Sequence, residues 1–155
     1  MTIRIITTYT PVADYDLGLF AIDLSRKSAV LIRQSMKNAG KDHYESRLLQ
    51  ENLIPIAIKV RGDRDDRNIL LFDEGAGVSG TKGYDEREKL SALYLAIAND
   101  IVGSLFLARP DRLFRDKHFT NVSMFTELAE RKKLKLIVPG KRVYDFTKYA
   151  DLQAF

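Results

Sequence analysis

The sequence predicts an α/β fold with a mostly parallel central sheet of four to five strands. Three observations predict it. Short apolar runs alternate with amphipathic stretches of helical spacing, turn residues separate them, and the length of 155 residues suits one domain. A chain of this length buries roughly 69% of its unfolded surface, which is enough for a self-sufficient core. Strands that alternate with helices pair in parallel through right-handed crossovers.

Four apolar runs are predicted as strands and three amphipathic stretches as helices. The strands are short and apolar, as expected for strands buried in a sheet. The helical stretches repeat apolar side chains every three or four positions. In chain order these elements are a strand at 28–32, a helix at 45–60, a strand at 68–72, a helix at 85–98, a strand at 103–108, a helix at 121–132 and a strand at 134–138.

Two residues set the expected ends of the helices, and one segment precedes the alternation. Pro55 is expected to kink or shorten the first helix, because proline has no backbone N–H. Asp85 is the predicted N-cap of the second helix. Residues 1–28 are interpreted as an N-terminal extension, with candidate strands at 3–8 and 17–24.

Composition and charge exclude several classes of protein. No apolar run approaches the ~18–20 residues that span a bilayer, and the N-terminus lacks a signal peptide's basic start and apolar core. We therefore expect a soluble, cytoplasmic protein with no membrane partner. Without cysteine and with only two distant histidines, neither a disulfide nor a metal site is predicted. Residues 108–148 hold eleven Lys and Arg against five Asp and Glu, which favours an anionic partner.

Sites in parallel sheets lie at the carboxyl ends of the strands. After the first strand, Arg33 and Ser35 share one side of an extended segment, so a nucleophile and an anion-binding group could face one ligand. A turn serine beside a surface arginine is the alternative. After the second strand, residues 73–83 form a glycine-rich loop that could offer N–H groups to phosphate. That loop nearly matches a P-loop, but Thr81 and Lys82 stand in reverse order.

The third strand leads into a charged segment with three arginines. Arg109, Arg112 and Arg115 are spaced so that a helical turn would place them on one face. Asp111 would orient an arginine or exchange a proton. The three strand ends together suit a phosphate held by guanidinium groups, and they contain no metal site and no imidazole base. A solvated loop whose charges pair with each other is the alternative.

Four motifs in order make the chain resemble the serine recombinases, the family of resolvases, invertases and large phage integrases. The matching residues are Arg33 and Ser35 for R-x-S, Ser46 and Gln50 for S-x-x-x-Q, Asp73, Gly75, Ser79, Gly80 and Arg87 for D-x-G-x-S-G with a following arginine, and Asp111, Arg112 and Arg115 for D-R-L-x-R. The chain departs from the pattern at Leu31, where tyrosine is common. It also carries two extra residues in the glycine loop and a longer insertion between Ser35 and Ser46.

The resemblance implies a resolvase-like three-layer sandwich and a mechanism. Ser35 would attack a DNA phosphodiester, forming a 5′-phosphoserine link and freeing a 3′-hydroxyl, without metal or cofactor. The expected roles of the other residues are phosphate contact for Arg33, Arg112, Arg115 and Arg87, proton donation or arginine orientation for Asp111, support for Gln50, Asp73 and Ser46, and a phosphate or DNA loop for Gly75, Ser79 and Gly80. The group that deprotonates Ser35 stays open.

The same resemblance implies a domain organisation and partners. Residues 29–155 would be the catalytic domain, and the dimerisation helix and DNA-binding domain that follow it in the family would lie outside this chain. The expected partners are double-stranded DNA and a second copy, with dimers joining into tetramers for strand exchange. Two alternatives remain: a non-catalytic module that binds DNA or a partner, and a P-loop-like nucleotide enzyme.

Overall fold

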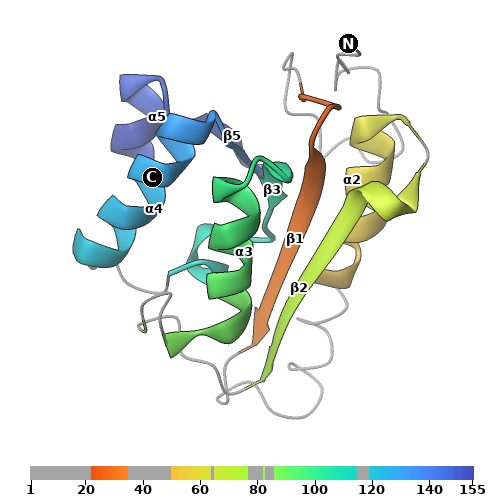
Figure 1. The fold of residues 1–155 in the computed structure, drawn as a ribbon, viewed down its shortest axis with the longest axis horizontal. Coiled ribbons are helices and arrows are strands. Elements are labelled where there is room, and N and C mark those ends of the chain that lie inside the picture. The colour runs from red at the N-terminus through yellow and green to blue at the C-terminus, as the bar shows by residue number, and fades with distance from the viewer. Residues whose placement is uncertain (1–21, 35–49, 64, 77–81, 83–85, 115–118) are drawn as a thin grey trace.

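A five-stranded sheet, in the order β2-β1-β3-β4-β5, organises the molecule (Figure 1). The structure is a computed structural model, and it describes all residues except 1–21, 35–49, 64, 77–81, 83–85 and 115–118. The strands are β1 (Lys27–Gln34), β2 (Ile69–Ala76), β3 (Val102–Phe106), β4 (Lys135–Val138) and β5 (Arg142–Asp145). The helices are α2 (Leu53–Arg61), α3 (Glu88–Ala98), α4 (Phe119–Lys132) and α5 (Tyr149–Ala154), with short 3₁₀ turns η3 (Asp66–Asn68) and η5 (Pro110–Arg112).

Four of the five strands run parallel, as the alternation of strands and helices predicts. Val30 of β1 pairs with Leu71 of β2 on one side and with Phe106 of β3 on the other. β3 pairs in parallel with β4. β5 alone is antiparallel, and it follows β4 through a tight turn at Pro139 and Gly140. Gly140 has a φ of 78°, a conformation that favours glycine, so the chain reverses there instead of crossing over.

Two apolar clusters lie on opposite faces of the sheet, which makes three layers. Alternate residues of β1 point to opposite faces: Ala29 and Leu31 join one cluster, and Val30 and Ile32 join the other. α3 and α4 cover the first face and α2 covers the second (Figure 1). The predicted three-layer α/β sandwich with a mostly parallel sheet is confirmed.

The first helix differs from its prediction in where it breaks. Residues 45–49 lie outside the described part of the chain, and the helix that begins by Gln50 is interrupted at Asn52. α2 then runs unbroken through Pro55 to Arg61, so the predicted kink precedes the proline. Pro55 sits in the first turn of α2, where its missing N–H costs little, but its ring would clash with the carbonyl four residues earlier.

The N-cap predicted at Asp85 for the second helix is wrong. α3 begins at Glu88, and Arg87 occupies the N-cap position in an extended conformation. The side chain of Arg87 is turned into the protein and is buried. The start of α3 is therefore fixed by a buried arginine, and the structure provides no side-chain cap hydrogen bond there.

The segment before β1 contributes to the packed region. Ile22 is buried in the apolar cluster beneath α2, and the Arg26 guanidinium donates a hydrogen bond of 2.8 Å to the carbonyl of Lys132. Most of the two candidate strands at 3–8 and 17–24 lies outside the described residues. The division between an extension and a domain at residue 28 stays a prediction. Within the described residues, no helix is long and apolar enough to cross a membrane.

Candidate active site at the carboxyl ends of three strands

Arg33 lies at the carboxyl end of β1, completely buried. The pairing of β1 with β2 shifts register between Ile32 and Gln34, so the ladder is irregular at Arg33. The Gln50 side chain bonds to the Arg33 backbone at this point: the Arg33 N–H donates to Gln50 Oε1 and Gln50 Nε2 donates to the Arg33 carbonyl, both at 3.1 Å. A side-chain amide thus satisfies both backbone groups of the arginine, which supports the predicted supporting role of Gln50.

Arg112 lies in η5, just beyond β3, and is nearly buried. Its backbone carbonyl accepts a hydrogen bond of 3.2 Å from Arg33 Nε. Two arginines that the sequence places 79 residues apart are therefore in direct contact. The expected convergence of the first and third strand ends is present in the structure.

Arg87 connects β2, the second strand in the chain, to Arg112. Its guanidinium forms a two-point ion pair with Glu74 of β2, with Nε 2.8 Å from Oε2 and Nη2 bonded to Oε1. Nη1 donates to the carbonyl of Leu113, and Nη2 lies 3.4 Å from the carbonyl of Arg112. The Arg112 carbonyl therefore accepts from both Arg33 and Arg87.

Asp73 shapes the start of the glycine-rich loop. Its Oδ1 accepts a hydrogen bond of 2.9 Å from the Gly75 N–H, and Gly75 has a φ of 68°. That left-handed conformation favours glycine, and the contact lies inside β2 where its pairing with β1 shifts register, just before the strand ends at Ala76. α3 starts only at Glu88, whereas a P-loop helix starts directly from its glycine loop.

The structure leaves several predicted residues without a description. Ser35, Ser46, Ser79, Gly80 and Arg115 lie outside the described residues, as does the side chain of Asp111. Their predicted roles stay predictions. Among the described residues, no three His, Asp or Glu side chains are grouped as they would be to hold a metal ion.

Sequence reasoning missed Glu74, the buried partner of Arg87. The signal was present, because Glu74 ends an apolar strand, and a carboxylate at such a position must find a cation if it is buried. It also stands next to Asp73, which drew attention as part of the motif. Which of two adjacent carboxylates faces the protein interior depends on how the strand is oriented.

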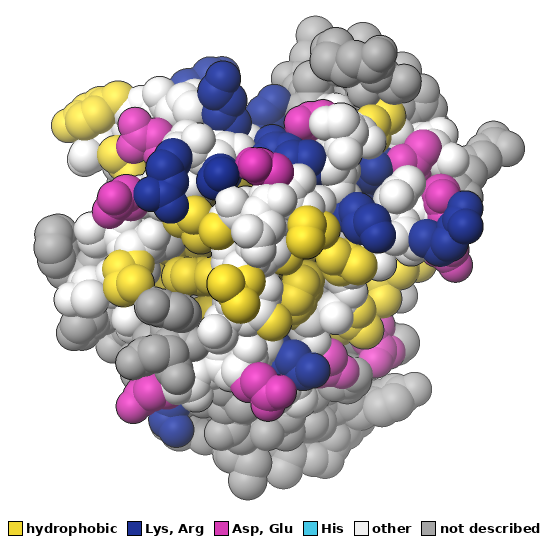
Figure 2. Space-filling view, viewed as in Figure 1, with side chains coloured by type: hydrophobic (Ala, Val, Ile, Leu, Met, Phe, Trp, Pro, Cys, Tyr) yellow, Lys and Arg dark blue, Asp and Glu magenta, His cyan; other side chains and the backbone are white. Residues whose placement is uncertain are grey.

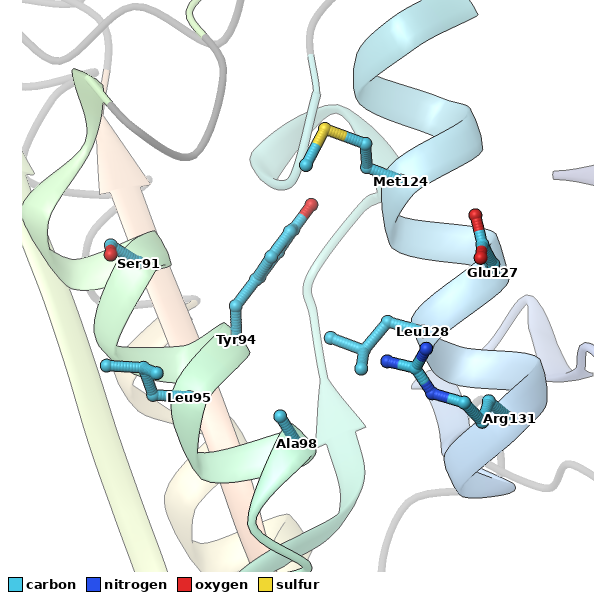
Figure 3. Close-up of a pocket in the computed structure, with 8 residues that line it drawn as sticks. All are labelled: Ser91, Tyr94, Leu95, Ala98, Met124, Glu127, Leu128 and Arg131. Carbon is cyan, nitrogen blue, oxygen red and sulfur yellow. The ribbon is translucent and has the colours of Figure 1, made fainter.

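A second feature lies on another surface of the molecule, between α3 and α4. A groove of about 370 Å³ lies there. Figure 3 shows Tyr94 of α3 and Leu128 of α4 pointing into the space between the two helices, with the Tyr94 ring directed toward Met124. Leu95 and Met124 at its edges are exposed. Figure 2 shows hydrophobic side chains gathered in the middle of this face and charged side chains around them. Exposed apolar patches of this kind are typical of protein contact surfaces.

Comparisons with known proteins show similarity to a solved structure but no matching family model. No protein-family model matches this sequence, and no curated protein matches it. Among solved structures, the N-terminal catalytic domain of TP901-1 integrase, a large serine recombinase, is similar with a TM-score of 0.53 and 20% sequence identity. The match covers 83% of this chain and 92% of that one. The fold is that of a serine integrase catalytic domain.

The integrase-like fold agrees with the resemblance that the motifs indicate. The resolvase-like architecture is confirmed, including its mostly parallel sheet. Arg33, Arg87 and Arg112 are contributed by three different parts of that fold and meet at one carbonyl group. At this level of identity the likeness concerns the fold, and the roles of individual side chains are predictions.

Proposed function

We propose that this integrase-like domain cuts and rejoins double-stranded DNA, with Ser35 as the nucleophile. The observation that carries the proposal is the contact between Arg33 and Arg112 at the carboxyl ends of β1 and β3. Arg33 stands two residues before Ser35 in the chain. Buried guanidinium groups interact strongly with an anion, because little water competes for their hydrogen bonds. Such a cluster, with a serine two residues further along the chain, suits transfer of a phosphoryl group.

The proposed reaction exchanges one phosphoester bond for another. Ser35 Oγ attacks phosphorus and loses its proton, while the bond from phosphorus to the 3′ oxygen breaks and that oxygen gains a proton. The 5′ end stays joined to Ser35, so the reverse attack by a 3′-hydroxyl reseals DNA without a cofactor. Arg33, Arg112 and Arg115 hold the non-bridging oxygens, and Asp111 supplies a proton or orients an arginine.

Access to the cluster is part of the proposal. Arg33 has no exposed surface and Arg112 very little, so a DNA phosphate reaches their guanidinium groups only after the surrounding side chains rearrange. Such rearrangement on binding is common in regulated interactions. If this rearrangement occurred only when two dimers assemble on DNA, cutting would be restricted to DNA sites that are held together.

Strand exchange needs two sites, so the proposal includes a dimer that joins a second dimer on DNA in the cytoplasm. The basic excess in residues 108–148 supports contact with DNA phosphates. The groove between α3 and α4 is the observation that favours the second candidate function, a non-catalytic module that binds a partner.

The test is formation of a covalent protein–DNA adduct. Purified protein is incubated with a pool of duplex DNA whose central segment is randomised, and the products are separated on a denaturing gel. We expect an adduct with the wild type and with the control Ser123→Ala, which alters a serine on α4, but none with Ser35→Ala, although that variant still binds DNA. An adduct in Ser35→Ala would show that another residue is the nucleophile. DNA binding without any adduct in the wild type would favour the binding module.

A further inference from the structure

The Glu74–Arg87 ion pair is enclosed in the protein at the end of β2. The Glu74 side chain is 1% exposed and the Arg87 side chain 0%. Burying two charges costs several kcal/mol per ion unless the pair is well aligned and its remaining donors are satisfied. The two-point geometry of this pair meets the first condition, and the remaining contacts of Arg87 meet the second.

The guanidinium of Arg87 has a protein oxygen at each of its three nitrogens. Nε and Nη2 bond to the Glu74 carboxylate, Nη1 bonds to the Leu113 carbonyl, and Nη2 also approaches the Arg112 carbonyl. The Phe114 ring packs against the same group, with Arg87 Cζ 5.9 Å from the ring centroid. Contact with a phosphate would require Arg87 to abandon oxygens that it already holds in a buried setting.

The carbonyls that Arg87 holds belong to the turn that carries Arg112. η5 is a single 3₁₀ turn, secured within itself by the hydrogen bonds of the Arg112 and Leu113 N–H groups to the carbonyls of Arg109 and Pro110. A turn this short has little rigidity of its own. Its attachment through Arg87 to Glu74 fixes it to β2.

We propose that Glu74 and Arg87 are positioning residues: Glu74 orients Arg87, and Arg87 holds the Arg112–Leu113 backbone so that Arg112 is placed for phosphate. The proposal rests on the proposed function for the role of Arg112. Arg87 was expected to contact phosphate, and here it instead supports the backbone of Arg112. It also adds Glu74, which no motif reasoning had singled out.

The test compares Glu74→Gln with a matched control, Asp63→Asn. Both changes turn a carboxylate into an amide beside a buried arginine, but Asp63 pairs with Arg61, which bonds to the Arg26 carbonyl before β1 at the opposite end of the sheet. In Glu74→Gln, one oxygen that faces Arg87 is replaced by an N–H donor, so one of the two bonds is lost. The control removes the charge of a similar ion pair far from η5, because Arg61 donates to Asp63 through Nε and Nη2.

The first measurement is hydrogen exchange of the Arg112, Leu113 and Phe114 amides, all hydrogen-bonded within the turn. We expect exchange at these amides to accelerate in Glu74→Gln and to stay unchanged in Asp63→Asn. The second is the rate of adduct formation on the randomised duplex pool at saturating DNA. A misplacement of about 1 Å can reduce a rate roughly 100-fold, so we expect a loss of about tenfold to 100-fold in Glu74→Gln with unchanged DNA affinity.

Arg87→Lys provides a second variant that keeps the charge opposite Glu74. Lysine cannot reach the carboxylate and both carbonyls at once, so this variant should show the same faster exchange and a similar rate loss. If the two residues act as one unit, the double variant Glu74→Gln/Arg87→Lys should lose no more than either single variant.

Three results would overturn the proposal. Glu74→Gln could match Asp63→Asn in both measurements, or the double variant could lose the product of the two single losses. Arg87→Lys could also lose adduct formation without any change in the hydrogen exchange of the η5 amides, which would assign Arg87 to direct phosphate contact. If the wild type forms no adduct, the proposed function fails, and exchange in η5 still decides whether Glu74 holds the turn.

Discussion

At the scale of single residues, the site depends on side chains that satisfy backbone groups. Gln50 bonds to both backbone groups of Arg33, and Arg87 bonds to the carbonyls of Arg112 in η5 and of Leu113 directly after it. A strand end or a short turn leaves such groups unpaired, and a buried group without a partner is costly. These contacts therefore fix the backbone from which the arginines extend.

Gln50→Ala tests this dependence. Removing the amide leaves the buried N–H and carbonyl of Arg33 without the partners they have in the structure, so we expect unfolding to become easier by roughly 1–3 kcal/mol. Gln153→Ala, an exposed glutamine on α5, should change stability by less than about 0.5 kcal/mol. Denaturant unfolding measures both. Equal effects of the two variants would contradict a structural role for the Gln50 bridge.

At the scale of elements, α3 shows how one helix serves both the core and the surface. Leu90, Leu93 and Ile97 recur at helical spacing and are buried against the sheet, whereas Leu95 is 62% exposed on the groove side. Arg87 is the N-cap residue of this helix, so the packing of α3 sets where the ion pair with Glu74 forms.

A matched pair of leucines on α3 separates these two faces. Leu93→Ala removes a fully buried side chain and should destabilise the protein by about 2–5 kcal/mol. Leu95→Ala, two residues away, removes a side chain that is mostly in water and should cost less than about 0.5 kcal/mol. Chemical denaturation followed by circular dichroism gives both values. A large effect of Leu95→Ala would show that the groove is covered in solution.

At the scale of the whole molecule, packing and ion pairs join segments that are distant in sequence. Phe125 of α4 contacts Phe114 after η5, Phe146 after β5 and Phe155 at the chain end, with ring centroids 5.7–6.3 Å apart. Asp151 of α5 binds Arg142 of β5 at 2.6 Å and accepts from the Asp145 N–H at 3.0 Å. The antiparallel strand and the last helix are attached to the core in this way.

The Asp151 carboxylate predicts how the stability of the protein depends on pH. Burial raises the pKa of Asp151, but hydrogen bonds from Arg142 and the Asp145 backbone and the charge of Arg142 outweigh it, so the net pKa lies below the ordinary 3.8. A lowered pKa in the folded state means that the unfolded chain binds protons first. The contribution is therefore complete above about pH 4 and is lost as the pH falls below that value.

Asp151→Asn is the corresponding test. Unfolding free energy measured over a series of pH values should fall less steeply in acid for this variant than for the wild type, because one titrating group is gone. Gln153→Ala, at an exposed position of the same helix, removes no titrating group and serves as the control, so it should keep the acid slope of the wild type. Identical acid slopes for the wild type and Asp151→Asn would contradict the assignment.

Most of the architecture could be predicted because periodicity is a local property. The alternation of apolar runs with helical spacing predicted the four strands β1 to β4 along the chain and their parallel pairing, but not their order in the sheet. The helix starts were less accurate. The break at Asn52 and the N-cap at Arg87 depend on steric conflict with Pro55 and on a buried ion pair, and neither follows from spacing.

The candidate site could likewise be predicted only in part. By itself the sequence determined which residue types stand at the strand ends, and so the choice of Arg33 and Arg112, because the carboxyl ends of parallel strands meet at one edge of the sheet. Arg87 was chosen through the family resemblance. Only the tertiary structure decided what each arginine touches: Arg33 and Arg87 share the Arg112 carbonyl, and Glu74 rather than Asp73 faces Arg87. The physical reason is that a buried charge takes its partner from whatever the packing brings within hydrogen-bond distance, and those groups come from distant parts of the chain.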